Sequence, residues 1–117
     1  MNSPSQDDRQ KDHELGIRVV TGSLVKEGYT IEAVNRDPEQ VPQIVASKDE
    51  HRVFFIVLTE RNTMPTLPDE IRSQCVAHAA KFGAACMFAP VSLYATGEQS
   101  PEGEEGFFVK YSGYSVA

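Results

Sequence analysis

The chain has 117 residues, which is enough for one domain with one modest hydrophobic core. It is 40% hydrophobic and 24% charged, and its net charge is −6. This acidity argues against non-specific binding to nucleic acid, which depends on clustered Lys and Arg side chains. No window reaches the roughly 18 consecutive apolar residues of a membrane-spanning helix. The first residues are polar and lack an apolar signal core, so we expect a cytoplasmic protein without a membrane partner.

Two parts are expected in chain order, a disordered tail over residues 1–11 and a single domain over residues 12–117. The first helix should begin at Asp12 or His13, with Asp12 as its cap, and should end at Glu27 before Gly28. Its buried face is predicted from residues that recur at helical spacing, namely Leu15, Val19, Val20, Leu24 and Val25.

Three strands should follow the first helix. Residues 29–35 alternate in polarity, and residues 41–47 form a second strand with an irregular start at Pro42. Residues 52–58 are almost uniformly apolar, which is typical of a central strand buried on both faces. Residues 48–51 should form the turn that joins the last two strands into a hairpin.

The second half of the chain predicts one helix and two strands. The helix starts near Pro68 and ends at Gly83, and its apolar stripe is Ile71, Cys75, Val76, Ala79 and Phe82. Residues 84–95 should form a strand that Pro90 interrupts, and residues 96–106 should form a mobile loop. A last strand should begin at Phe107. The predicted order is α-β-β-β-α-β-β, an α/β (α+β) fold with a mixed central sheet flanked by helices. The strands on either side of the second helix should be parallel.

The cysteines and histidines do not form a recognisable metal or catalytic motif. Cys75 and Cys86 lack zinc-site spacing, and we expect both to be small core residues, with a disulfide possible but unsupported. His13 and His51 are expected to be exposed. His78 follows Cys75 by three residues on one helix, which favours a packing role over a nucleophile and base pair.

The run from His13 to Arg61 contains several pieces in register with a known family. The pieces are Gly16, the stretch "GYTI" at residues 28–31, Asn35, the stretch "PQIVA" at residues 42–46 and the stretch "FIVLTER" at residues 55–61. Together they resemble the small YraN-like proteins of the PD-(D/E)xK restriction-endonuclease-like superfamily. The resemblance covers about the first half of the chain and implies a nuclease-like fold.

The same resemblance identifies four positions at which the family's catalytic residues are replaced. The family's helix Glu falls on Ile17, its strand Asp on Gln43, its second-strand Glu on Val57 and its Lys on Thr59. Two carboxylates would hold the divalent metal of such a nuclease, and the Lys would stabilise charge or position water. A site without a carboxylate cannot hold Mg²⁺, so the resemblance implies a nuclease-like scaffold without nuclease chemistry and without a cofactor.

Two alternatives remain open. Glu32 and Glu60 could rebuild a Mg²⁺ site, which would make the chain a metal-dependent nuclease with relocated carboxylates. The chain could instead bind nucleic acid without cutting it, through Arg61, Lys48 and Arg52, although these are dispersed along the hairpin. We expect an interaction or scaffold protein with no nucleic-acid partner, and self-association as a homodimer through the exposed edge of the C-terminal strand.

Overall fold

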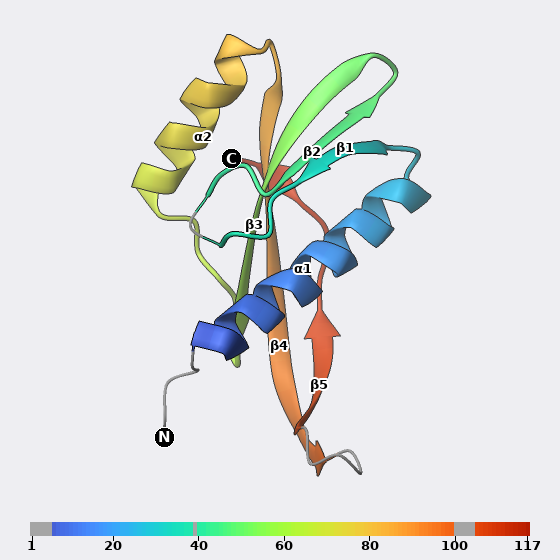
Figure 1. The fold of residues 1–117 in the computed structure, drawn as a ribbon, viewed down its shortest axis with the longest axis vertical. Helices are drawn as coiled ribbons and strands as arrows, with labels where there is room; N and C mark the ends of the chain where they lie inside the picture. Colours follow the sequence, from blue (N-terminus) through green and yellow to red (C-terminus); the bar gives the residue numbers. More distant parts are fainter. Residues whose placement is uncertain (1–5, 39, 100–104) are drawn as a thin grey trace.

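A computed structural model describes residues 6–38, 40–99 and 105–117. The fold is one mixed six-stranded sheet with two helices, α1 (Gln6–Lys26) and α2 (Asp69–Lys81) (Figure 1). The strands are β1 (Thr30–Val34), β2 (Ile44–Lys48), β3 (His51–Arg61), β4 (Ala85–Gln99), β5 (Glu105–Lys110) and β6 (Ser115–Val116). Five strands lie in the order β1-β2-β3-β4-β5, and β6 pairs with β4. The chain order α1-β1-β2-β3-α2-β4-β5-β6 adds a short sixth strand to the prediction. Within the described ranges, neither helix is long and apolar enough to cross a membrane.

Helix α1 begins at Gln6, so the predicted start at Asp12 or His13 is wrong. Residues 6–11 are helical rather than part of a disordered tail, because each residue added to an existing helix gains a backbone hydrogen bond. Residues 1–5 of the predicted tail lie outside the described residues. The predicted end is confirmed, since Gly28 has a φ of 98° and the Tyr29 N–H bonds the Leu24 carbonyl at 3.0 Å.

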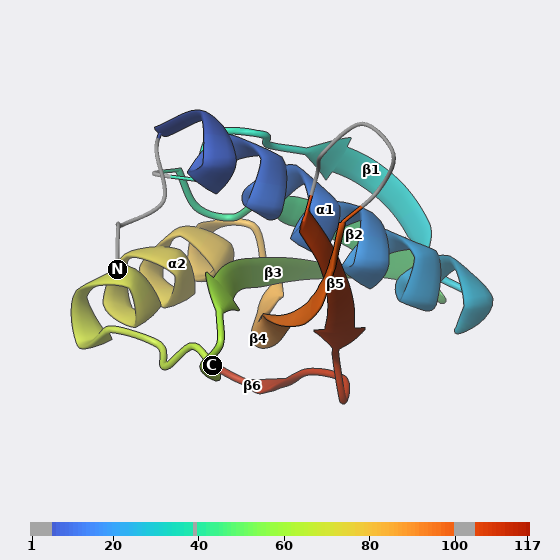
Figure 2. The ribbon, with the colours of Figure 1, turned by 90° about the horizontal axis from the view of Figure 1, so that it is seen from below.

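The buried face of α1 agrees with the predicted one at Val20 and Leu24 and differs from it at Ile17 and Val25. Ile17, Val20 and Leu24 recur at steps of three and four and are buried in the main core, whereas Val25 is exposed. The resemblance aligns Ile17 with the family's helix Glu, and the structure places its side chain in the main core. The helix crosses one face of the sheet diagonally (Figure 2), so only the row of residues that faces the strands is covered.

Strands β1, β2 and β3 form the predicted antiparallel meander. Asp49 and Glu50 join β2 to β3, and their φ values of 51° and 68° are both positive, as a two-residue hairpin turn of type I′ requires. The five residues from Val53 to Val57 are all buried, which confirms β3 as a central strand. Val53, Phe55 and Val57 face α1, while the alternate residues of β3 join the core beneath α2.

Helix α2 joins β3 to β4, and these two strands are parallel, as predicted. Pro90 does not interrupt β4, which continues past it in register with Leu58 of β3. The predicted stripe of α2 is correct for Cys75 and Ala79 but wrong for Val76 and Phe82, which are exposed. The helix contacts the sheet along one narrow row of small side chains, so residues beside that row stay accessible.

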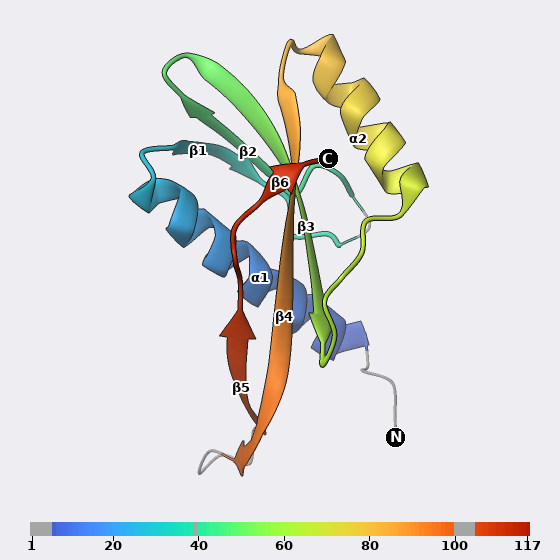
Figure 3. The same ribbon diagram turned by 180° about the vertical axis from the view of Figure 1, so that it is seen from behind.

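The C-terminal segment also departs from the prediction. Strand β4 extends to Gln99 and β5 begins at Glu105, so most of the predicted mobile loop at 96–106 belongs to a hairpin, and residues 100–104 lie outside the described residues. The expected single last strand is divided into β5 and β6. Both lie along the side of β4 that β3 does not use (Figure 3), because β4 is long enough to pair with each in turn.

Helix α1 and strand β3 approach each other most closely at Gly16. A Cβ atom at this position would overlap Thr59 Oγ1 and lie 3.1 Å from Thr59 Cβ. Thr is β-branched and restricted at χ1, so its hydroxyl cannot easily move away. The absence of a side chain at Gly16 therefore sets the distance between the helix and the sheet.

We expect Gly16→Ala to lower the free energy of unfolding by about 1–3 kcal/mol, because the added methyl group overpacks the contact with Thr59. Adding Thr59→Ala should recover part of this loss by removing the overlapping hydroxyl. Urea unfolding followed by circular dichroism measures both effects.

Gly22 on the same helix is the matched control, because a Cβ there meets no atom within 4 Å. Gly22→Ala should raise the free energy of unfolding by about 0.5–1 kcal/mol through helix propensity alone. Equal stabilisation by both substitutions would contradict the close approach at Gly16.

Candidate functional site

The four positions that the resemblance assigns to catalysis lie where α1 crosses the ends of β2 and β3. Ile17 comes from α1, Gln43 immediately precedes β2, and Val57 and Thr59 lie on β3. Ile17 and Val57 are buried members of the main core. The place expected to be a cleft is therefore closed by apolar packing between helix and sheet.

Gln43 is fully buried, and its side-chain amide is engaged at both ends. Its Oε1 accepts a hydrogen bond from the Val57 backbone N–H at 2.8 Å, and its Nε2 donates to the Gln40 carbonyl at 2.7 Å. Its backbone N–H donates to the Phe55 carbonyl at 3.0 Å. The side chain thus continues the ladder of hydrogen bonds along β3 beyond the first pair of β2, Ile44 with Phe55.

The structure brings Gln43 and Val57 into direct contact, as the register of the resemblance requires of a pair of metal ligands. The contact joins a side-chain oxygen to a backbone N–H, however, and not two side chains to a common space. A carboxamide oxygen that already accepts a hydrogen bond in a fully buried position is a structural group.

Thr59 lies beneath Gly16, on the same face of β3 as Val57. Its Oγ1 is buried and has no hydrogen-bond partner among the residues that the structure describes. The family's Lys would need space above this point to reach a phosphate, and the backbone of α1 occupies that space.

A partly buried ion pair lies beside these positions and was missed by the sequence analysis. Asp12 of α1 accepts two hydrogen bonds from Arg61 at the end of β3, at 2.7 Å from Nε and 3.1 Å from Nη2. Asp12 is buried and does not cap the helix as predicted. Arg61 also lies 4.7 Å from the centre of the Phe107 ring, a cation–π contact. Asp12 precedes Gly16 by one helical turn, so it lies on the same inner face.

His13 is buried, which corrects the expectation that it is exposed. Its Nε2 lies 3.4 Å from the Asn35 carbonyl, and the Asn35 N–H in turn donates to the Gln43 carbonyl at 2.7 Å. Burial lowers the pKa of His13 below its ordinary value, partly offset by the backbone contact to Asn35. The imidazole therefore connects α1 to the chain that leads into β2. His51 is exposed, as predicted.

The alternative acids are not gathered into a metal site. Glu32 on β1 pairs with Arg52 on β3, with 3.2 Å between Oε1 and Nη2. Glu60 is exposed near the end of β3. Among the residues that the structure describes, no three His, Cys, Asp or Glu side chains are grouped so that they could hold a metal ion.

The cationic residues considered for nucleic-acid contact are also engaged. Lys48 Nζ lies 5.5 Å from the centre of the Tyr29 ring, and Arg52 is held by Glu32. Together with the Arg61–Asp12 pair, these contacts leave the three side chains pointing to different parts of the hairpin and not to a common surface.

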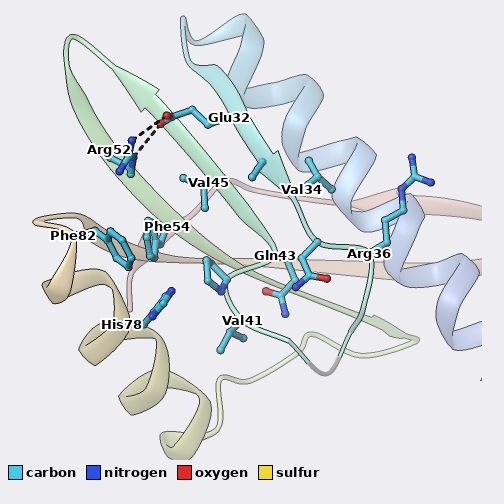
Figure 4. A pocket seen from close by; sticks show the side chains of 13 residues that line it. Glu32, Val34, Arg36, Val41, Gln43, Val45, Arg52, Phe54, His78 and Phe82 are labelled. Atoms are coloured by element: carbon cyan, nitrogen blue, oxygen red, sulfur yellow. Dashed lines mark hydrogen bonds and ion pairs between the residues drawn. The ribbon is translucent and has the colours of Figure 1, made fainter.

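A groove of about 600 Å³ lies on the face of the sheet that carries α2 (Figure 4). Its apolar lining comes from Val41 before β2, Val45 on β2 and Phe54 on β3. His78 and Phe82 of α2 form the opposite wall. Further lining comes from Glu32, Ala33, Val34, Asn35, Arg36, Pro42, Gln43 and Arg52.

His78 packs between aromatic rings in this groove. Its ring centre lies 5.5 Å from that of Phe54 and 5.2 Å from that of Phe82. Cys75, three residues earlier, points into the core and contacts Cys86. Cys75 therefore faces the core, whereas His78 is exposed and contacts the rings of Phe54 and Phe82, which favours the predicted packing role.

The solved structures that resemble this chain include a nucleic-acid enzyme. Hjc, a Holliday junction resolvase from the archaeal hyperthermophile Archaeoglobus fulgidus, is similar with 20% identity over 81% of this chain and 74% of that chain, at a TM-score of 0.48. No curated protein matches the sequence. The family model described as "Domain of unknown function (DUF8840)" matches residues 10–116, nearly the whole chain. The chain therefore belongs to the DUF8840 family.

Proposed function

We propose that this chain is a restriction-endonuclease-like domain that acts by binding to other proteins and not by cleaving phosphodiesters. The observation that carries the proposal is the Gln43 carboxamide, which replaces the family's Asp and uses both of its ends to stabilise the fold. The fold assignment rests on the sequence resemblance. The order of a helix, an antiparallel meander, a helix and a strand parallel to β3 supports it.

The chemistry of the four replaced positions supports a non-catalytic role. Mg²⁺ prefers octahedral oxygen coordination with one or two carboxylates and several waters. Ile17 and Val57 supply hydrocarbon to the core instead, and Gln43 supplies an oxygen that already accepts the Val57 N–H. The volume that would hold the metal and its waters is filled by side chains of the core.

The nearby ion pair supports the same conclusion. Asp12 is a buried acidic residue of α1, and it lies five residues before Ile17, which aligns with the family's helix Glu. Both of its carboxylate oxygens accept hydrogen bonds from Arg61. A carboxylate held by a guanidinium in this bidentate form is satisfied without a metal. The pair links α1 to the end of β3.

We further propose that the chain associates with a second copy of itself through β5. This strand is last in the sheet order, so one side of its backbone pairs with β4 and the other side is an edge. Phe108 and Val109 are exposed on it, and the Phe108 ring stacks on Tyr94 of β4 with 5.2 Å between ring centres. Antiparallel pairing of two β5 edges would cover this aromatic surface in a symmetric dimer.

The purified full chain should leave linear DNA, branched DNA and RNA intact in Mg²⁺ or Mn²⁺, because the positions that would bind the metal are used in the core. Gel electrophoresis of the nucleic acids after incubation measures cleavage, with an active nuclease as the positive control. Cleavage that disappears in Glu32→Ala or Glu60→Ala would instead establish a metal-dependent nuclease with relocated carboxylates.

Gln43→Met should lower the free energy of unfolding by about 1–3 kcal/mol, because the buried Val57 N–H loses its acceptor. Gln74→Met on the exposed surface of α2 is the control and should change stability by no more than about 0.5 kcal/mol. Thermal unfolding with and without Mg²⁺ provides both readouts. A Mg²⁺-dependent rise in Tm that is present in the unaltered chain and absent in Gln43→Met would indicate a metal ligand.

Phe108→Lys should shift the chain toward monomer in sedimentation velocity, because a charge on each copy would meet its equivalent at the β5 edge. Phe82→Lys is a matched control, since both phenylalanines are 55% exposed but Phe82 lines the groove. Dissociation by Phe82→Lys alone would assign the dimer contact to the groove. A monomer at every concentration would rule out self-association through β5.

A further inference from the structure

Two cysteines from different elements meet in the smaller core, between α2 and the sheet. Cys75 on α2 and Cys86 on β4 have 3.0 Å between their Sγ atoms. Both are free thiols and both are buried, with Cys75 fully enclosed and Cys86 7% exposed. Phe54, Ile56 and Ala79 complete this cluster, so the two sulfurs are held against each other by packing.

The arrangement is suited to a covalent link. A disulfide has a sulfur–sulfur length of about 2.05 Å, so the two atoms need to approach by only about 1 Å. The chain between them is short, because α2 ends at Lys81 and Gly83, with a φ of 64°, turns directly into β4. The two elements are packed together in the reduced form and need not rearrange to be linked.

We propose that Cys75 and Cys86 are a redox modification site, at which a peroxide converts the two thiols into an intramolecular disulfide that links α2 to β4. Cys86 attacks the peroxide and becomes a sulfenic acid, releasing one water. Cys75 then attacks the Cys86 sulfur and displaces the second water. Two thiols and one hydrogen peroxide thus give one disulfide and two waters, with the peroxide reduced by the two electrons that the sulfurs lose.

The surroundings of the pair favour Cys86 as the sulfur that reacts first. The hydrogen bond between the two thiols lowers the pKa of Cys86, and burial opposes this effect. Cys86 also lies nearer to solvent. The Ala117 N–H donates to the Cys86 carbonyl at 3.0 Å, and Ala117 packs against the cluster that contains both cysteines.

The link would act on the groove described above. His78 follows Cys75 by one turn of α2 and Phe82 follows at the end of the helix, and both line the groove. A disulfide at Cys75 would prevent α2 from separating from β4, so the oxidised form would keep this wall in place. The proposal does not depend on whether the chain cleaves nucleic acid or forms a dimer.

The test exposes the reduced full chain to hydrogen peroxide and measures intact mass, remaining thiols after unfolding, and Tm. We expect the loss of two hydrogen atoms in mass, no titratable thiol and unchanged monomer mobility in non-reducing gels. The Tm should rise by about 10 °C, because the link restricts the unfolded chain, and dithiothreitol should reverse every change.

Cys75→Ala and Cys86→Ala are the controls, checked for folding by circular dichroism. Neither should gain stability on oxidation, and the remaining cysteine should add oxygen or form a link between two chains. Either of two results with the unaltered chain would overturn the proposal. One is that both thiols still titrate after treatment, and the other is that its products carry added oxygen or link two chains.

Discussion

The packing of α1 across the end of β3 is the contact on which the rest of the structure depends. Gly16 allows the helix backbone to lie directly over Thr59, and one turn earlier Asp12 binds Arg61. The helix covers the main core from Ile17 to Leu24 at the spacing that this contact sets. A larger residue at Gly16 would move the helix away from every strand that it covers.

The same contact limits the space at the four positions that the resemblance aligns with catalytic residues. In a metal-dependent nuclease this region must hold a cation, its waters and a phosphate. Here the helix, Val57 and the Gln43 amide fill it, and each polar atom of Gln43 completes a backbone hydrogen bond. A groove lies on the face of the sheet that carries α2, between the β1–β3 meander and α2, and Gln43 is one of the residues that line it.

Periodicity predicted those elements whose local pattern agrees with their burial. Strand β3 is uniformly apolar and is buried on both faces, and Gly28 and Gly83 end the two helices where positive φ values are needed. The errors occurred where long-range contacts override local signals. Asp12 is a good capping residue in isolation, but the helix continues through it because Arg61, 49 residues later, binds its carboxylate. Pro90 lacks an N–H, yet β4 continues through it in register with Leu58 of β3, while β5 pairs with β4 from Ser92 onward and β6 pairs at Met87 and Phe88.

The sequence by itself determined the mixed α and β class of fold, the parallel pairing across α2 and the uncharged side chains at Ile17, Gln43, Val57 and Thr59. These follow from local hydrophobic pattern, chain connectivity and residue identity, none of which needs coordinates. Only the tertiary structure showed that the Gln43 side chain accepts the hydrogen bond of the Val57 N–H, that Asp12 pairs with Arg61 and that Cys75 contacts Cys86. Each of these contacts joins residues from different elements. Their distance in space is set by how helices and strands pack, which sequence spacing does not encode.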